Sequence, residues 1–207
     1  LAVTAKFQGL FTKPVNDMLG SSCARVFSDL IGGRHFAPLA DKPLHDAATE
    51  RDTPRGHSGL KIAFFYGCVV DKMFPRIGEA VLKVCDHHGV GVFMPHGQAC
   101  CGIPALSSGD RETFEKLVAL NMKLFAEADF DVLVTPCATC TSTIKKIWPL
   151  MAEDLPATTR FQIKALSAKV KDISAFLIQD LGVTPADVAV SGEPVVVTYH
   201  DPCHLKK

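Results

Sequence analysis

From residue 60 onward, short apolar runs alternate with longer segments whose apolar residues recur at helical spacing. Short apolar runs indicate buried strands, and the helical spacing indicates helices with one apolar face. Strands separated by helices pair in parallel, so this order predicts an α/β fold with a parallel sheet and helices on both faces. The predicted strands are 60–66, 90–94, 131–135 and 194–199, and the predicted helices are 77–88, 110–128, 139–151 and 158–181, the last in one or two pieces.

The organisation of the chain changes near residue 58. Residues 1–58 combine an amphipathic stretch, 15–31, with a polar, proline-containing segment, and they predict a helical or irregular arm and linker. Residues 59–193 form the predicted main domain. The last residues, 194–207, repeat its opening, since "KIAFFYGC" and "VVVTYHDPC" both lead an apolar strand into a loop cysteine. The chain starts at Leu1 without a methionine, and we expect it to be a segment of a longer protein.

Composition excludes several classes of function. The 22 basic and 22 acidic residues balance without a basic stripe, so no nucleic-acid partner is predicted. The apolar runs are too short to cross a bilayer, and no transmembrane segment is predicted. Eight cysteines in 207 residues are too sparse for a disulfide-stapled secreted fold. We therefore expect a reducing, cytoplasmic compartment in which the thiols are ligands.

Five of the cysteines fall into one pattern. Cys68 is followed after 31 residues by the adjacent pair Cys100 and Cys101, and after 35 more by Cys137 and Cys140 in a Cys-x-x-Cys arrangement. Each group comes after a predicted strand. The carboxyl ends of parallel strands lie at one edge of a sheet, so the five thiols are predicted to converge there. Three loop glycines would let the backbone approach a bulky group closely: Gly67, Gly97 and Gly102.

The adjacent pair constrains the kind of metal. Neighbouring side chains diverge, so Cys100 and Cys101 do not readily bind one tetrahedral ion, and a disulfide between them would be strained. Two sulfurs leaving the backbone together suit a site with several metal atoms, which indicates an iron–sulfur cluster and electron transfer. Two alternatives remain: a zinc site that uses four of the five thiolates, and a thioredoxin-type pair at Cys137 and Cys140. A zinc deaminase is excluded, because no His-x-Glu lies upstream.

The remaining cysteines and histidines have less specific patterns. Cys23 and Cys85 lie in amphipathic segments and are predicted to pack in the core. Cys203 is either a sixth ligand or the opening cysteine of the second repeat. His96 either tunes the site through a hydrogen bond or is solvated, and His200 and His204 flank Cys203. No catalytic acid–base constellation and no nucleotide-binding glycine fingerprint is present, so no catalytic residue is predicted.

The cysteine pattern, together with "CCGIPALSSGD" and "TPCATC", resembles the CCG or cysteine-rich domain. That domain occurs in heterodisulfide reductase, in the iron–sulfur subunits of FAD-linked lactate and glycolate oxidases, and in anaerobic glycerol-3-phosphate dehydrogenase. The family carries two such motifs in tandem, and "YHDPCHL" resembles the start of the second. The resemblance implies that Cys68, Cys100, Cys101, Cys137 and Cys140 hold a [4Fe-4S] cluster of the noncubane type. Zinc or a conventional cluster is the alternative.

The resemblance also implies a function. The chain would be the iron–sulfur electron-transfer subunit of a flavin-linked D-lactate or glycolate dehydrogenase. Its partners would be an FAD-binding subunit, a ferredoxin-like module, and a quinone or another acceptor. The expected location is cytoplasmic or peripheral to the inner face of the membrane. The alternatives are a heterodisulfide reductase-type subunit with a directly catalytic cluster, and a zinc-bound docking module.

Overall fold

The computed structural model describes residues 24–25, 35–36, 38–184, 187 and 196–199. The chain divides into two compact units: residues 1–49 with 69–79, and residues 50–68 with 80–207. Cys68, Cys100, Cys101, Cys137 and Cys140 all belong to the second unit. The predicted amphipathic stretch 15–31 lies outside the described residues except for Ala24–Arg25 (β1), which pairs antiparallel with His35–Phe36 (β2).

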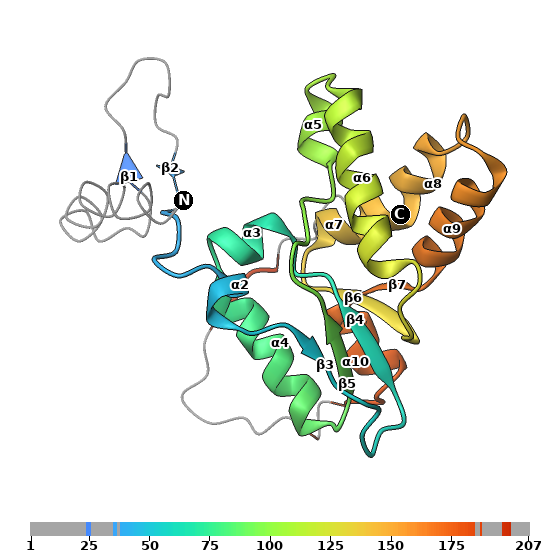
Figure 1. Ribbon diagram of the computed structural model, residues 1–207. Helices are drawn as coiled ribbons and strands as arrows, with labels where there is room; N and C mark the ends of the chain where they lie inside the picture. Colours follow the sequence, from blue (N-terminus) through green and yellow to red (C-terminus); the bar gives the residue numbers. More distant parts are fainter. Residues whose placement is uncertain (1–23, 26–34, 37, 185–186, 188–195, 200–207) are drawn as a thin grey trace. The chain divides into compact units, whose positions relative to one another are not determined.

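The second unit is built on a five-stranded sheet with the order β3-β5-β4-β6-β7 (Figure 1). The last four strands in the sequence pair in parallel, and the short β3 pairs antiparallel with β5. Ile62 of β4 aligns with Val92 of β5 on one side and with Val132 of β6 on the other. The strands are β3 (Arg51–Asp52), β4 (Lys61–Phe64), β5 (Gly91–Met94), β6 (Val132–Thr135) and β7 (Val170–Asp172).

Helices connect these strands. The connection from β4 to β5 contains α3 (Gly67–Lys72) and α4 (Pro75–His87), which contribute residues to both units. The connection from β5 to β6 contains α5 (Ile103–Ser107) and α6 (Arg111–Phe125). Between β6 and β7 lie α7 (Ala138–Ser142), the π-helix η1 (Thr143–Ile147), α8 (Trp148–Met151) and α9 (Ala157–Ala168), and α10 (Ile173–Gln179) follows β7. Asp110 caps α6, since its side chain accepts a hydrogen bond from the amide of Thr113.

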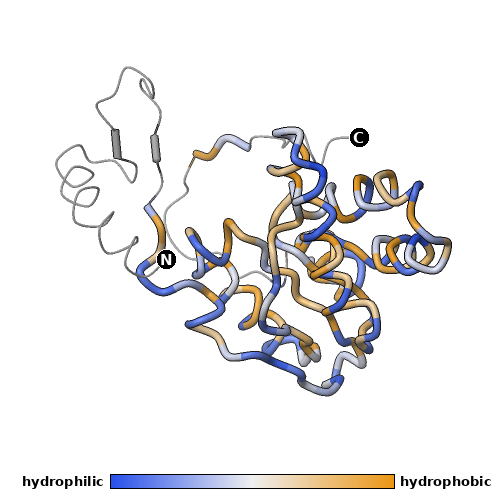
Figure 2. Tube along the Cα trace, turned by 45° about the horizontal axis from the view of Figure 1, so that its top comes forward, coloured by the Kyte–Doolittle hydropathy of each residue, from blue (hydrophilic) through white to orange (hydrophobic). Residues whose placement is uncertain are grey.

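The sheet is buried on both faces, which explains the nearly continuous apolar strands. Ala63, Phe65 and Leu133 share a core cluster with side chains of α6, α7, η1, α8 and α9. Alternate strand residues point to the opposite face, where α10 packs against β6 and β7 and buries Phe176. Along the helices, orange and blue alternate repeatedly in Figure 2, as one-sided burial requires. The predicted α/β class is confirmed.

Two features of the sheet differ from the prediction. The fourth parallel strand is β7, within the predicted helical region 158–181, whereas residues 196–199 form no strand and 194–195 lie outside the described residues. The three-residue β7 contains one fully buried apolar residue, Val170, so it leaves no period-2 signal between two helices. The edge strand β3 was also missed, because Arg51 and Asp52 are polar.

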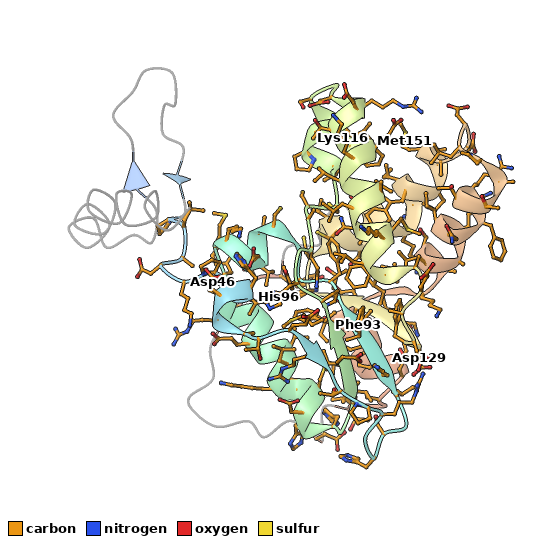
Figure 3. The ribbon with its side chains drawn as sticks, viewed as in Figure 1. Asp46, Phe93, His96, Lys116, Asp129 and Met151 are labelled. Atoms are coloured by element: carbon orange, nitrogen blue, oxygen red, sulfur yellow. The ribbon has the colours of Figure 1, made fainter. Side chains whose placement is uncertain are left out.

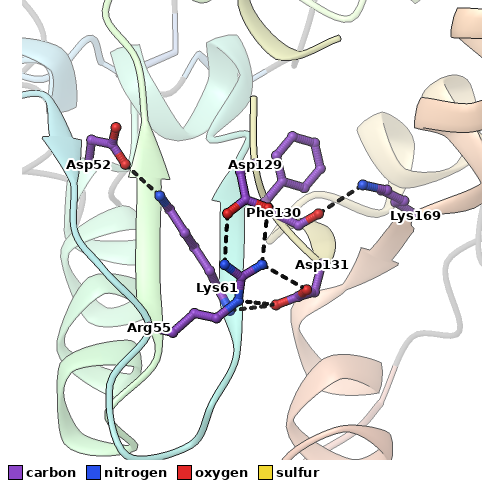
Figure 4. Close-up of polar contacts among 7 residues, drawn as sticks. All are labelled: Asp52, Arg55, Lys61, Asp129, Phe130, Asp131 and Lys169. Atoms are coloured by element: carbon purple, nitrogen blue, oxygen red, sulfur yellow. Dashed lines mark hydrogen bonds and ion pairs between the residues drawn. The ribbon is translucent and has the colours of Figure 1, made fainter. Parts of the chain in front are cut away.

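The amino ends of β4 and β6 are joined by an ion network around Arg55 (Figure 4). Its guanidinium donates to Asp129 at 2.7 Å and to Asp131 at 3.0 Å. Asp131 in turn accepts a hydrogen bond from the amide of Lys61 at 2.8 Å. These hydrogen bonds with Arg55 hold the pKa of both carboxyl groups below the ordinary value. The network fastens the edge of the sheet opposite to the cysteines.

In the first unit, α2 (Leu44–Ala47) is tied to α3 by a buried carboxylate. Asp71 accepts hydrogen bonds from the amide of His45 at 3.0 Å and from its ring Nδ1 at 2.7 Å, and it pairs with Lys72 at 2.8 Å. Burial by itself would raise the pKa of Asp71, but the hydrogen bonds from Lys72 and His45 outweigh burial and hold the pKa below its ordinary value. Leu44 is fully buried and packs against Gly78, where a side chain would collide with it.

Candidate metal centre

The five cysteines of the pattern converge at the carboxyl edge of the parallel strands. Cys68 follows β4 in the first turn of α3, and the pair Cys100–Cys101 lies in the loop between β5 and α5. Cys137 and Cys140 follow β6 at the start of α7. β4 lies between β5 and β6 in the sheet. The connection after β4 therefore leads to β5 on one side, and the connection after β5 crosses back to β6 on the other side. Open α/β sheets bind ligands at such a switch point.

The sulfurs form a continuous series of contacts. Cys68 Sγ lies 3.4 Å from Cys100 Sγ. Cys100 also accepts a hydrogen bond from Cys101, and the single S–H of Cys140 lies within reach of the sulfurs of both Cys101 and Cys137. All five are free thiols, and Cys101 and Cys140 are buried. Within the described residues, no three His, Cys, Asp or Glu side chains gather around a single point as the ligands of one ion would.

The surroundings favour negative charge on two of the thiols. Hydrogen bonds from Cys101, Cys68 and the amides of Gly102 and Cys101 lower the pKa of Cys100 to about 2. Hydrogen bonds from Cys140 and from the amides of Cys140 and Thr139 lower the pKa of Cys137 to about 6. Donation to Cys100 raises the pKa of Cys101 to about 11. The backbone N–H groups thus point at the sulfurs, as binding of an anionic metal group requires.

Two of the three predicted glycines are needed for this geometry. Gly67 has a φ of 69°, and an added Cβ would lie 3.0 Å from Cys140 Sγ. Gly102 has a φ of 94°, and an added Cβ would lie 2.7 Å from the ring of Phe114. Gly97 also has a positive φ, but its Cβ position is open. Only glycine combines such a φ with such close contacts.

Several supporting side chains were missed by the sequence patterns. Asn121, fully buried on α6, accepts from the amide of Ala99 at 3.0 Å and donates to the carbonyl of Cys100 at 3.1 Å. Gln98 donates to the carbonyl of Phe64 at 2.9 Å. Trp148 Nε1 donates to the carbonyl of Cys101 at 2.9 Å. Asn121 is itself a polar residue on the apolar face of the helix predicted at 110–128, and this exception was the signal in the sequence for a buried polar contact.

The other predicted residues have different positions. Cys85 is buried on α4, which confirms its core assignment, and burial raises the pKa of its thiol to about 12. His96 Nε2 accepts a hydrogen bond from the amide of Glu50 at 3.1 Å. The remaining candidates lie outside the described residues: Cys23, His200, Cys203 and His204.

Comparisons with known proteins agree with this geometry. The profile of the CCG family, described as a cysteine-rich domain, matches residues 62–145. This part of the chain therefore belongs to the CCG cysteine-rich domain family, and the predicted resemblance is confirmed. The matched segment contains the five cysteines of the pattern.

Three relatives illustrate the range of similar proteins. The chain is 38% identical over 150 residues to a fumarate reductase (CoM/CoB) subunit of Methanothermobacter marburgensis, covering 71% of the chain and 26% of the relative. It is 32% identical over 148 residues to "Lactate utilization protein A" of Bacillus pumilus, covering 72% and 59%. It is 34% identical over 146 residues to "Probable glycolate oxidase iron-sulfur subunit" of Bacillus subtilis, covering 70% and 32%. The chain thus spans between 26% and 59% of the length of these relatives.

No solved structure matches the chain. Among the described residues, no helix combines the length and the apolar character needed to span a membrane.

Proposed function

We propose that this chain is the iron–sulfur electron-transfer part of an oxidoreductase subunit, and that Cys68, Cys100, Cys101, Cys137 and Cys140 bind its cluster. The observation that carries the proposal is the series of five contacting thiols at one edge of the sheet. Sulfurs arranged in series suit a group with several metal atoms better than a single tetrahedral ion. The description of the Bacillus subtilis relative as an iron–sulfur subunit supports the same cofactor.

The residues of this chain fit such a cofactor through both charge and position. A [4Fe-4S] cluster, noncubane in the form proposed here, supplies reversible one-electron transfer when bound. Asn121 and Trp148 fix the carbonyls of Cys100 and Cys101, and Thr141 holds the carbonyl of Cys137 at 3.0 Å. These side chains would thus hold the loop of the cysteine pair and the start of α7 in place during a change of charge, which keeps reorganisation small.

The names of the relatives suggest the substrate. Two are described as a lactate utilization protein and a glycolate oxidase subunit, so we propose a flavin-linked 2-hydroxyacid dehydrogenase as the complete enzyme. A separate FAD-binding subunit would oxidise the hydroxyacid. Its electrons would reach a quinone or another carrier through the cysteine edge described here. The thiol site itself consists of sulfurs and backbone amides, which matches a conductor of electrons rather than an acid–base catalyst.

A second candidate follows from the relative in Methanothermobacter marburgensis, which is named for CoM and CoB. In that alternative the cluster acts directly on a thiol or disulfide substrate. Oxidation of the reduced, isolated protein by the CoM–CoB heterodisulfide would favour it. Transfer of electrons from a flavoprotein without any reaction with the heterodisulfide would favour the electron-transfer role.

The first test is iron, sulfide and zinc analysis with EPR on protein purified without oxygen. About four iron and four sulfide per chain, with a paramagnetic signal on oxidation or reduction, is the expected result. Zinc without iron would replace the cluster proposal with a zinc-bound docking module.

The ligand assignment is tested by a pair of cysteine variants. Cys101→Ser should lose or convert the cluster, because Cys101 contacts Cys100 and Cys140 at the centre of the thiol series. Cys85→Ser should retain full iron content and lose only modest stability, because Cys85 packs in the core. Equal loss of iron in both variants would show that the assignment is wrong.

A further inference from the structure

A pocket of about 230 Å³ lies between α6, α8 and α9, behind the cysteine pair. Its floor is made of six side chains that are each no more than 7% exposed: Phe114, Val118, Met122, Trp148, Ala152 and Ile163. Its mouth is formed by residues that solvent reaches more easily, among them Glu115, Ala119 and Met151. Figure 3 shows Met151 between α8 and α6, at this mouth.

The pocket and the thiols share a wall. The indole N–H of Trp148 donates to the carbonyl of Cys101 at 2.9 Å, and the ring of Phe114 packs against Gly102. Both aromatic side chains also line the pocket. The indole ring of Trp148 therefore links the pocket to the backbone carbonyl of Cys101 through one hydrogen bond.

The lining determines which molecules fit. None of the described residues around the pocket is basic, so a carboxylate such as lactate or glycolate would lose its hydration without gaining a partner. The sulfurs of Met122 and Met151 and the rings of Trp148 and Phe114 favour contact with another aromatic ring. A protein cavity of about 150 Å³ holds benzene, so this larger pocket has room for a fused two-ring system.

We propose that this pocket binds a flat, neutral aromatic molecule. This inference rests on the electron-transfer function proposed above. The redox-active ligand of the pocket would be a quinone, whose ring accepts electrons from the cysteine edge. Reduction of a quinone to a quinol consumes two electrons and two protons. The electrons come one at a time from the reduced cluster, which the flavin of the partner subunit reduces again, and the protons come from water at the pocket mouth near Glu115.

The chain contains a single tryptophan, Trp148, so its intrinsic fluorescence reports on the pocket directly. The probes are 2,3-dimethyl-1,4-naphthoquinone, whose substituted ring does not add to thiols, and naphthalene, which is not redox-active. Both should change Trp148 fluorescence in a saturable way.

The variant Ala119→Phe places a ring in the pocket mouth from an exposed position of α6. It should raise the Kd of the probes by about tenfold or more, because the ring takes contact surface that the probe would otherwise use. Ala168→Phe, at an exposed position of α9 that does not line the pocket, is the matched control and should leave the Kd unchanged.

A second measurement follows electrons. Protein reduced by dithionite without oxygen is mixed with the naphthoquinone or with ferricyanide, and loss of the reduced EPR signal is timed. Ala119→Phe should slow reoxidation by the quinone severalfold and leave reoxidation by ferricyanide unchanged.

The outcomes separate the two proposals. Absence of a cluster defeats the electron-transfer function, while naphthalene binding still decides whether the pocket takes an aromatic ring. A cluster that is present and reduced, together with no saturable fluorescence change or with equal Kd values for wild type and Ala119→Phe, overturns the pocket proposal. That second result would mean that the pocket is covered by the surface of a protein partner and does not bind an aromatic molecule.

Discussion

At the scale of single residues, three side chains without metal-binding groups organise the cysteine loops. Asn121 bridges Ala99 and Cys100, Gln98 links its loop to the end of β4, and Trp148 holds the carbonyl of Cys101. Each satisfies a backbone group that the loop cannot satisfy through sheet or helix hydrogen bonds. Their loss would therefore affect both stability and the position of the sulfurs.

Trp148→Phe tests this at the carbonyl of Cys101. The variant removes the donor and leaves a buried acceptor, so the free energy of unfolding should fall by about 1–3 kcal/mol, measured by urea denaturation. The midpoint potential of the cluster should also shift in an EPR-monitored redox titration, because a hydrogen bond beside a ligand has been lost.

The matched control is Phe125→Leu, which removes a ring from the same core cluster. Phe125 belongs to the packing between α6 and the sheet, and its ring contacts are with Phe65 and Phe93. It should lose stability without moving the potential. An unchanged potential in Trp148→Phe as well would reduce the role of the indole to packing.

At the scale of elements, the segment after β6 departs from a regular helix. The predicted helix 139–151 is α7, then the π-helix η1, then α8. A π-turn adds a residue to the helical repeat and rotates the side chains that follow it. In this chain the insertion lies between Cys140 and Trp148. It thus sets the orientation of the indole relative to the cysteines, which a uniform 3.6-residue period could not show.

The contact between α2 and α3 gives a pH-dependent prediction. In Asp71→Asn the free energy of unfolding at pH 7 should fall by about 1–2 kcal/mol, because hydrogen bonds to a charged carboxylate are lost. The pKa of Asp71 is depressed in the folded state, so its stabilisation is complete above the ordinary carboxyl pKa, near pH 4. As the pH falls through the lower folded pKa, this stabilisation is lost and the two proteins should become similar.

Asp46→Asn is the control for this measurement. Its carboxylate is 57% exposed and lies 3.5 Å from His45 Nε2. The substitution should therefore change the free energy of unfolding by no more than about 0.5 kcal/mol, both at pH 7 and at pH 3. A difference for Asp71→Asn that persists unchanged at pH 3 would contradict the assignment of the stabilising charge to Asp71.

At the scale of the whole molecule, the proposed cluster would connect the loops that follow β4, β5 and β6. A group that binds only the folded chain stabilises it by mass action. Removing the metal with a chelator under reducing conditions should lower the Tm by more than about 5 °C in calorimetry, since each kcal/mol is worth roughly 2–4 °C at this size. Proteolysis should then begin in the loop 95–104. An identical Tm before and after removal would mean that the thiols are arranged without help from a metal.

The sequence by itself determined the α/β class, four of the helical regions, three of the parallel strands and the convergence of five thiols. These follow from local periodicity and from the rule that parallel strands end at one edge. The strand at Val170–Asp172, the edge strand at Arg51–Asp52 and the buried contacts of Asn121, Trp148 and Asp71 were decided only by the tertiary structure. Each depends on a partner more than twenty residues away, and no local pattern in the chain identifies that partner.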